Sequence, residues 1–96
     1  MTYHPVQGYY QHVDGGLYFL EKIGKSTVDL SEHVVYTHIY PFEKQTWIRP
    51  LAEWAEPRFK LIKETDAIAI MLSTDRAVMQ VAVSEQKAAR RLREGR

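Results

Sequence analysis

The chain has no cysteine among its 96 residues. Disulfides, thiolate nucleophiles and cysteine-rich zinc sites are therefore excluded, and the composition suits a reducing compartment. An excess of either charge is missing too, since 13 Lys and Arg stand against 12 Asp and Glu. No overall field draws such a chain to nucleic acid or to an anionic membrane. Any function that depends on charge must use a local cluster.

Long hydrophobic runs are also missing. No stretch approaches the roughly 20 apolar residues of a membrane-spanning helix. The N-terminal "MTYHPVQGYY" lacks the charged start and apolar run of a signal peptide. With 45% hydrophobic and 26% charged residues, the composition is that of one globular domain with a modest core. We expect a cytoplasmic protein.

Motifs of catalysis and metal binding are absent as well. The "GKST" at Gly24 resembles the end of a phosphate-binding loop, but Phe19 stands where that motif requires its first glycine. The four histidines form no HExxH pair, and His33 and His38 are wrongly spaced for one face of a helix or strand. No GxSxG turn or paired acids stand out. We expect no metal, cofactor or catalytic residue, although a site assembled across loops would leave no such pattern.

The first sixty residues carry β-strand and turn signals. Asp14-Gly15-Gly16 predicts a tight hairpin turn, because glycine adopts the positive φ that such turns require. A second hairpin closes around Pro41 to Lys44, while residues 24–33 form a loop in which Val28 and Leu30 could make a brief edge strand. "LAEWAE" allows one helical turn. The predicted strands, typical of a small barrel or sandwich, are residues 9–13, 17–23, 34–40, 45–49 and 58–62.

After these strands the pattern becomes helical. We predict a short helix over 66–72, capped at Thr65-Asp66, although "DAIAIML" also fits a buried strand. A longer helix over 75–94 begins at the Ser73-Thr74-Asp75 cap and ends in basic residues, which suit the helix dipole. Met79 and Val83 lie on its other side and belong either to one broad buried face or to a subunit contact. The stripe expected to pack on the core is Ala77, Val78, Val81, Ala88, Ala89 and Leu92.

The hairpin "VVYTHIYPFEKQTWIRP" carries an unusual set of ring-bearing side chains. With a loop at residues 41–44, Tyr36 lies opposite Arg49 and His38 opposite Trp47, all on one face. The other face is then the better core and carries Val35, Thr37, Ile39, Thr46 and Ile48. The ring-bearing face has the chemistry of a binding surface, because it can stack on planar ligands and attract anions. Burial of Trp47 as a structural residue is the alternative, and a one-residue slip would exchange the faces.

Several motifs resemble a known family. "GYYQHVDGGLY" at Gly8, "VY" at Val35, "WIRPL" at Trp47 and "PRF" at residues 57–59 are similar to the pattern of domain of unknown function 1653. The resemblance covers about residues 8–59 and implies a compact SH3-like β-barrel, but no established activity. The helical tail resembles those of phage-borne relatives. We therefore expect an α+β protein with a small SH3-like barrel over residues 1–62 and a helical extension over 63–96 packed on the barrel or on a partner subunit.

Three functions compete. The leading hypothesis is a non-enzymatic module that binds a small, planar, anionic ligand, such as a nucleotide-derived signal sequestered by a phage protein. Its expected ligand-binding residues are Tyr10, His12, Tyr36, His38, Trp47, Arg49 and Arg58. The alternatives are an SH3-like module for extended peptides, and a nucleic-acid-binding protein using the basic tail, which the near-neutral charge disfavours. We also expect a homo-oligomer, because a small barrel with a two-sided helix buries little surface per chain.

Overall fold

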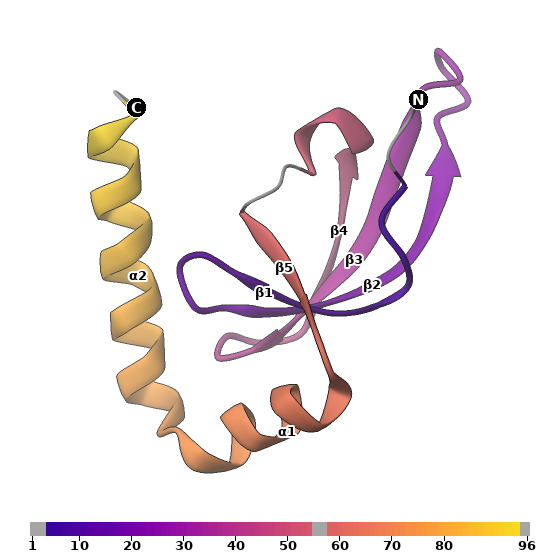
Figure 1. Cartoon of the computed structure of the whole chain (residues 1–96). Coiled ribbons are helices and arrows are strands. Elements are labelled where there is room, and N and C mark those ends of the chain that lie inside the picture. Colours follow the sequence, from indigo (N-terminus) through magenta and orange to yellow (C-terminus); the bar gives the residue numbers. More distant parts are fainter. Residues whose placement is uncertain (1–3, 55–57, 95–96) are drawn as a thin grey trace.

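The computed structural model describes residues 4–54 and 58–94 (Figure 1). Five strands form one antiparallel sheet in the order β4-β3-β2-β1-β5, and two helices follow. This architecture confirms the predicted α+β class. The strands are β1 (Gly8–His12), β2 (Leu17–Lys25), β3 (Glu32–Tyr40), β4 (Gln45–Pro50) and β5 (Phe59–Ile62). A 3-10 turn, η1 (Leu51–Glu53), follows β4, and the helices are α1 (Glu64–Ser73) and α2 (Arg76–Arg93). The end of "LAEWAE", at residues 55–56, lies outside the described residues.

The turn between β1 and β2 is the one that its glycines predicted. The Asp14 carboxylate accepts a hydrogen bond from the Gly16 amide at 3.0 Å, and Gly15 has φ of +101°. That conformation is costly for a residue with a side chain. The sequence therefore specified this turn locally.

The sheet curls around an aromatic core. Tyr36 of β3 and Phe59 of β5 are separated by two strands, yet their ring centroids are 6.3 Å apart. Trp54 stacks on Phe59 with a centroid separation of 3.8 Å. Among the described strands no pairing joins β4 to β5, so these two remain the sheet edges. The core residues are Tyr10, Tyr18, Leu20, Val34, Tyr36, Trp54 and Phe59.

Two irregularities interrupt the pairing of β2 with β3. Leu20 pairs with Tyr36 and Lys22 with Val35, so Glu21 is an extra residue in β2. Near the other end of the ladder, Ile39 is the extra residue in β3. A bulge of this kind redirects side chains. The bulge at Glu21 lets Lys22 follow it without placing an ammonium group in the aromatic core.

The two helices test the predicted caps. α1 is a helix and not a strand, but it begins at Glu64 with no side-chain cap, so the predicted Thr65-Asp66 cap is wrong. α2 has its predicted cap, because the Asp75 carboxylate accepts a hydrogen bond from the Val78 amide at 2.9 Å. Among the described residues, no single helix is long and apolar enough to span a bilayer, and α1 and α2 pass such a test only as a pair bent by 109°.

The packed face of α2 differs from the predicted one. Val83 is 1% exposed, whereas Val81 of the predicted stripe is 58% exposed. Val78 and Leu92 are exposed too, so the assignment of that stripe to the core is wrong. The reason is that α2 crosses the ends of two hairpins, whose turns offer backbone carbonyls. Arg76 and Gln80 donate hydrogen bonds to the Pro41 carbonyl, so the inward face carries long polar side chains.

Candidate functional site

Four of the five predicted ligand-binding rings lie inside the protein. Tyr10, His12, Tyr36 and His38 are all buried against the aromatic core. The prediction that the opposite face of the central hairpin forms the core is therefore wrong. The stretch "VVYTHIY" carries apolar or aromatic residues on both faces, so alternation alone could not choose the inner one. Large rings fill the space inside the curled sheet better than Val and Thr.

The register of β3 and β4 also differs from the prediction. Tyr36 lies opposite Trp47, and His38 lies opposite Gln45. This is a shift of two residues, so the predicted residues keep a common face. Trp47 remains 51% exposed because it lies on an edge strand.

The two predicted arginines make contacts within the protein. The Arg49 Nε donates to the Tyr36 hydroxyl at 3.1 Å, and its Cζ is 5.9 Å from the ring centroids of both Tyr36 and Phe59. Arg58 forms an ion pair with Glu94, just beyond the end of α2. The structure thus brings Arg49 to the ring of Tyr36. The predicted open surface that these two residues would share with Tyr10, His12 and His38 does not form, because all four rings are buried.

A buried polar cluster joins the first hairpin turn to α2. His12 Nδ1 lies 3.0 Å from the Asp14 carboxylate, and both side chains are buried. Arg90 of α2 places Nη1 at 3.1 Å from His12 Nε2. The Asp14 amide also donates to Nδ1 at 3.2 Å, so this nitrogen faces both a backbone donor and the carboxylate. These contacts link Arg90 through His12 to Asp14.

Burial and charge shift the pKa values in this cluster. Burial raises the pKa of Asp14, but hydrogen bonds from His12 and the Gly16 amide, with the positive charges of His12 and Lys87, outweigh it and hold the pKa below its usual value. Burial lowers the pKa of His38, and the charge of Lys87 acts in the same direction. Burial and the charge of Asp14 raise the pKa of the Tyr18 hydroxyl. Asp14 is therefore anionic and His38 neutral at neutral pH.

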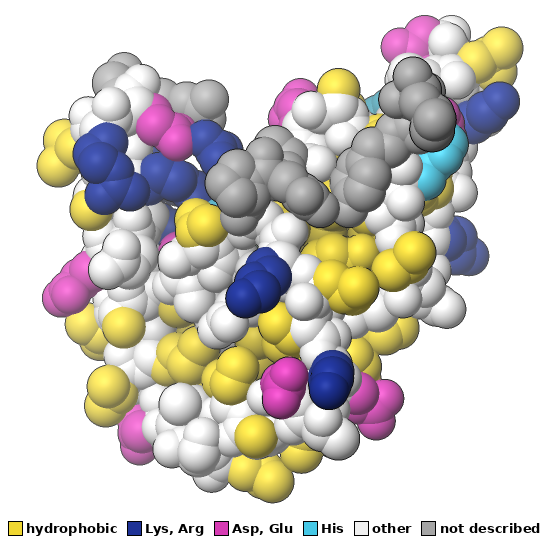
Figure 2. Space-filling model, in the orientation of Figure 1, with side chains coloured by type: hydrophobic (Ala, Val, Ile, Leu, Met, Phe, Trp, Pro, Cys, Tyr) yellow, Lys and Arg dark blue, Asp and Glu magenta, His cyan; other side chains and the backbone are white. Residues whose placement is uncertain are grey.

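This cluster attaches α2 to the sheet. His38 stacks on Tyr18 at 4.7 Å between centroids, and its Nε2 donates to the Tyr40 carbonyl at 2.9 Å. Lys87 lies over the Phe42 ring. Such contacts are typical of a structural polar cluster and need no ligand. Figure 2 shows the Lys and Arg side chains gathered toward the C-terminal end of α2, where Arg90 reaches the cluster.

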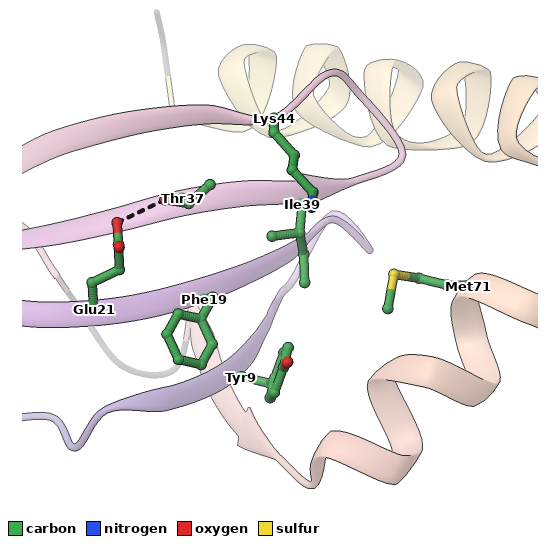
Figure 3. Close-up of a pocket in the computed structure, with 7 residues that line it drawn as sticks. All are labelled: Tyr9, Phe19, Glu21, Thr37, Ile39, Lys44 and Met71. Carbon is green, nitrogen blue, oxygen red and sulfur yellow. Dashed lines mark hydrogen bonds between the residues drawn. The ribbon is translucent and has the colours of Figure 1, made fainter.

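A hollow lies on the outer face of the sheet, opposite the core (Figure 3). Its volume is about 340 Å³, and it lies between β1, β2, β3 and α1. The rings of Tyr9 and Phe19 form its aromatic wall, edge to face with centroids 5.0 Å apart. Its lining residues are Tyr9, Phe19, Glu21, Thr37, Ile39, Lys44 and Met71. A largely apolar hollow with a few polar groups is the usual form of a small-ligand site.

The polar groups of this hollow are ordered by a chain of hydroxyls. The Thr37 hydroxyl donates to Glu21 Oε2 at 2.8 Å, and the Thr46 hydroxyl lies 3.0 Å from that of Thr37. Since Thr37 uses its proton on Glu21, Thr46 is the donor to Thr37. Glu21 Oε1 has no hydrogen-bond partner among the described residues. The carboxylate is therefore held at one oxygen and can accept at the other.

Both bulges of the β2–β3 pairing fall in this hollow. The extra residues are Glu21 and Ile39, and both line it. Without the bulges, the alternation of side chains along β2 and β3 would change, and Glu21 or Ile39 would no longer point into the hollow. The two bulges therefore shape its wall. A second hollow of about 480 Å³ shares Tyr9 and Phe19 and continues over Leu61 of β5. We call these two neighbouring hollows the outer groove, because Tyr9 and Phe19 line both.

Sequence reasoning missed this groove because it assigned the outer face to the core. The signal that could have found it is the two-sided apolar pattern, since a sheet face with Tyr9, Phe19 and Ile39 but no covering element stays partly open. The buried Asp14–Arg90 link was missed because 78 residues separate His12 from Arg90. No group of His, Asp and Glu in the described part of the chain could hold a metal ion.

Comparison with known proteins gives one result. A family model described as "Protein of unknown function (DUF1653)" matches residues 8–61. No curated protein and no solved structure matches the chain. The matched segment covers β1 to β4 and nearly all of β5, which is more than half of the chain, and it confirms the resemblance seen in the sequence motifs. The chain belongs to the DUF1653 family.

Proposed function

We propose that this protein is a non-enzymatic module that binds a small planar group in the outer hollow of the sheet. The observation that supports this most is the meeting of two partly buried rings, Tyr9 and Phe19, with a carboxylate that has one oxygen available. A planar ring stacks on or against such side chains. A donor on its edge, such as an exocyclic amine, reaches Glu21.

The charges of the hollow favour a ligand with both a donor and an anionic group. Lys44 is exposed at the rim and offers an ammonium group to an anion, while Glu21 lies farther along the sheet. A nucleotide has this combination of a flat base with amine or hydroxyl donors and a phosphate. Sequestration of a nucleotide-derived signal is the form such binding would take in a phage-encoded chain. The volume of about 340 Å³ suits one base or one aromatic side chain, not a large cofactor.

A panel of nucleotides tested by NMR titration on the isotope-labelled protein examines this proposal. We expect amide shift changes at Phe19, Thr37 and Lys44, with little change near Arg49, which lies on the core side. Lys44→Gln should weaken phosphate-bearing ligands and leave the free nucleoside unchanged. Trp47→Leu is the matched control, because Trp47 does not line the hollow. Shift changes confined to Arg49 and Trp47 would instead place the binding site on the face predicted from sequence. The absence of shift changes with every nucleotide of the panel would contradict the proposal.

Peptide binding is the second candidate. It is favoured by the continuation of the hollow into the second one over β5, because Tyr9 and Phe19 line both and an extended ligand could occupy both. A short peptide with an aromatic residue should then perturb Leu61 and Ile62 as well as Phe19. Perturbation restricted to the first hollow would favour the small ligand.

A further inference from the structure

The two edges of the sheet are protected unequally. β5 has four residues, includes the exposed Lys60 and is followed directly by the exposed Lys63. Short edge strands and lysines are common means by which proteins prevent an edge from pairing with another chain. This edge therefore resists the addition of a strand.

The β4 edge has none of these features over most of its length. It has six residues without a lysine, and its pairing with β3 runs without a bulge from Pro50 to Gln45. Its one charged side chain, Arg49, turns to the Tyr36 hydroxyl, and its proline stands at the very end. Trp47 is 51% exposed and Ile48 is 69% exposed, on opposite faces of the strand. An exposed, regular edge with two large apolar side chains is a template for strand pairing.

We propose that the β4 edge pairs antiparallel with the β4 edge of a second copy of this chain, about a two-fold axis at Trp47. A two-fold axis perpendicular to the sheet keeps each face of one sheet continuous with the same face of the other. With the axis at Trp47, this ring lies opposite its own copy, and Thr46 lies opposite Ile48 of the partner. These are aromatic and β-branched cross-strand pairs, which stabilise a sheet.

The charges of β4 favour a second copy as the occupant. In this register Arg49 lies opposite Gln45 of the partner, so no like charges face each other across the new pair. The joined sheet has ten strands, and its free ends are the lysine-bearing β5 edges, so the assembly stops at two chains. Strands of six residues make a contact of only about 20 Å length, at the small end of specific interfaces. The dimer should therefore dissociate on dilution.

Cross-linking of single-cysteine variants tests this pairing cleanly, because the natural chain has no cysteine. Trp47→Cys should form a disulfide-linked dimer under mild oxidation. A mixture of Thr46→Cys and Ile48→Cys should give a higher yield of cross-linked dimer than either variant gives alone. Val28→Cys is the control, since Val28 is 91% exposed in the β2–β3 loop. A yield at every β4 position no higher than that of Val28→Cys overturns the proposal, and so does a yield at Val81→Cys of α2 that exceeds them all.

Mass in solution gives an independent measurement. Light scattering over a range of concentrations should show the mass rise from that of one 11.2 kDa chain toward twice that value. Trp47→Lys should abolish the rise while circular dichroism shows an unchanged fold, since half of this side chain is already in water. Leu92→Lys, on the exposed face of α2, should leave the rise unchanged. A chain that stays monomeric at every concentration, or that loses its dimer through Leu92→Lys alone, overturns the pairing of β4. The outer hollow does not include Trp47 or Ile48, so this result is independent of ligand binding.

Discussion

Replacement of Val83 by alanine should destabilise the protein, whereas the same replacement at Val81 should not. The two residues carry the same side chain two positions apart in α2, but Val83 is 1% exposed and Val81 is 58% exposed. Their comparison therefore isolates the packing of α2 from the helix propensity of valine. It also tests directly which face of the helix meets the sheet.

The magnitude follows from the contacts of Val83. Its Cγ2 lies 3.6 Å from the position that a Cβ of Gly15 would occupy, and Gly15 has no side chain to fill a void. Loss of two buried carbons costs about 1.6 kcal/mol at about 0.8 kcal/mol each. A residual cavity raises this to about 2 kcal/mol, although the flexible Met79 fills part of it. Val81→Ala should change the free energy of unfolding by less than about 0.5 kcal/mol, and in the stabilising direction, because alanine is the better helix former.

Urea denaturation followed by far-ultraviolet circular dichroism measures both variants. For a domain of this size, about 2 kcal/mol corresponds to a fall in Tm of roughly 8–16 °C. Amide hydrogen exchange then shows whether the loss is local to α2 or global, since local detachment would leave the amides of β2 and β3 protected. A cost for Val81→Ala equal to or larger than that for Val83→Ala would refute the observed orientation of α2 and restore the stripe predicted from sequence.

Two further predictions concern the polar cluster and the first turn. Because burial lowers the pKa of His38 in the folded state, the unfolded chain takes up a proton at this residue at a higher pH than the folded chain does. The contribution of His38 to stability is therefore complete above the unfolded-state pKa of about 6.5 and is lost as the pH falls through the folded-state pKa. Urea titrations should show a smaller loss of stability between pH 7 and pH 5 for His38→Phe than for the wild type, and an equal loss would contradict this reasoning. Gly15→Ala should lower the free energy of unfolding by about 1–2 kcal/mol, because Gly15 has a φ of +101°. Gly24→Ala, with nothing within 4 Å of the added carbon, should lower it less. Comparable losses of Tm in the two variants would show that backbone strain at Gly15 is not the cause.

Local features of the fold were predictable because their signals are local. Asp14-Gly15-Gly16 carries its own turn geometry, and Asp75 caps the helix that follows it through a contact three residues away. The predicted strand ends lie within a few residues of the observed ones, because segments rich in β-branched and aromatic residues are separated by turn residues. The site was predicted less well. Ring-bearing and basic residues were named for the ligand, but four of the seven are buried.

The sequence by itself determined the order of strands and helices, the hairpin turns and the α2 cap, since each depends on residues close together in the chain. It also determined the family, whose motifs are spread over residues 8–61 but are read directly from the residue types. Only the tertiary structure decided which face of each element is buried. The segments "VVYTHIY" and "AVMQVAV" are apolar on two sides, so their preference is set by partners elsewhere. Tyr36 turns inward because Phe59 and Trp54 meet it there, and α2 turns Val83 and Arg90 inward because Gly15 and His12 meet them. Contacts between residues so far apart in the chain produce no periodic pattern in the sequence. They alone determine which face of the sheet is packed and which face keeps the open groove.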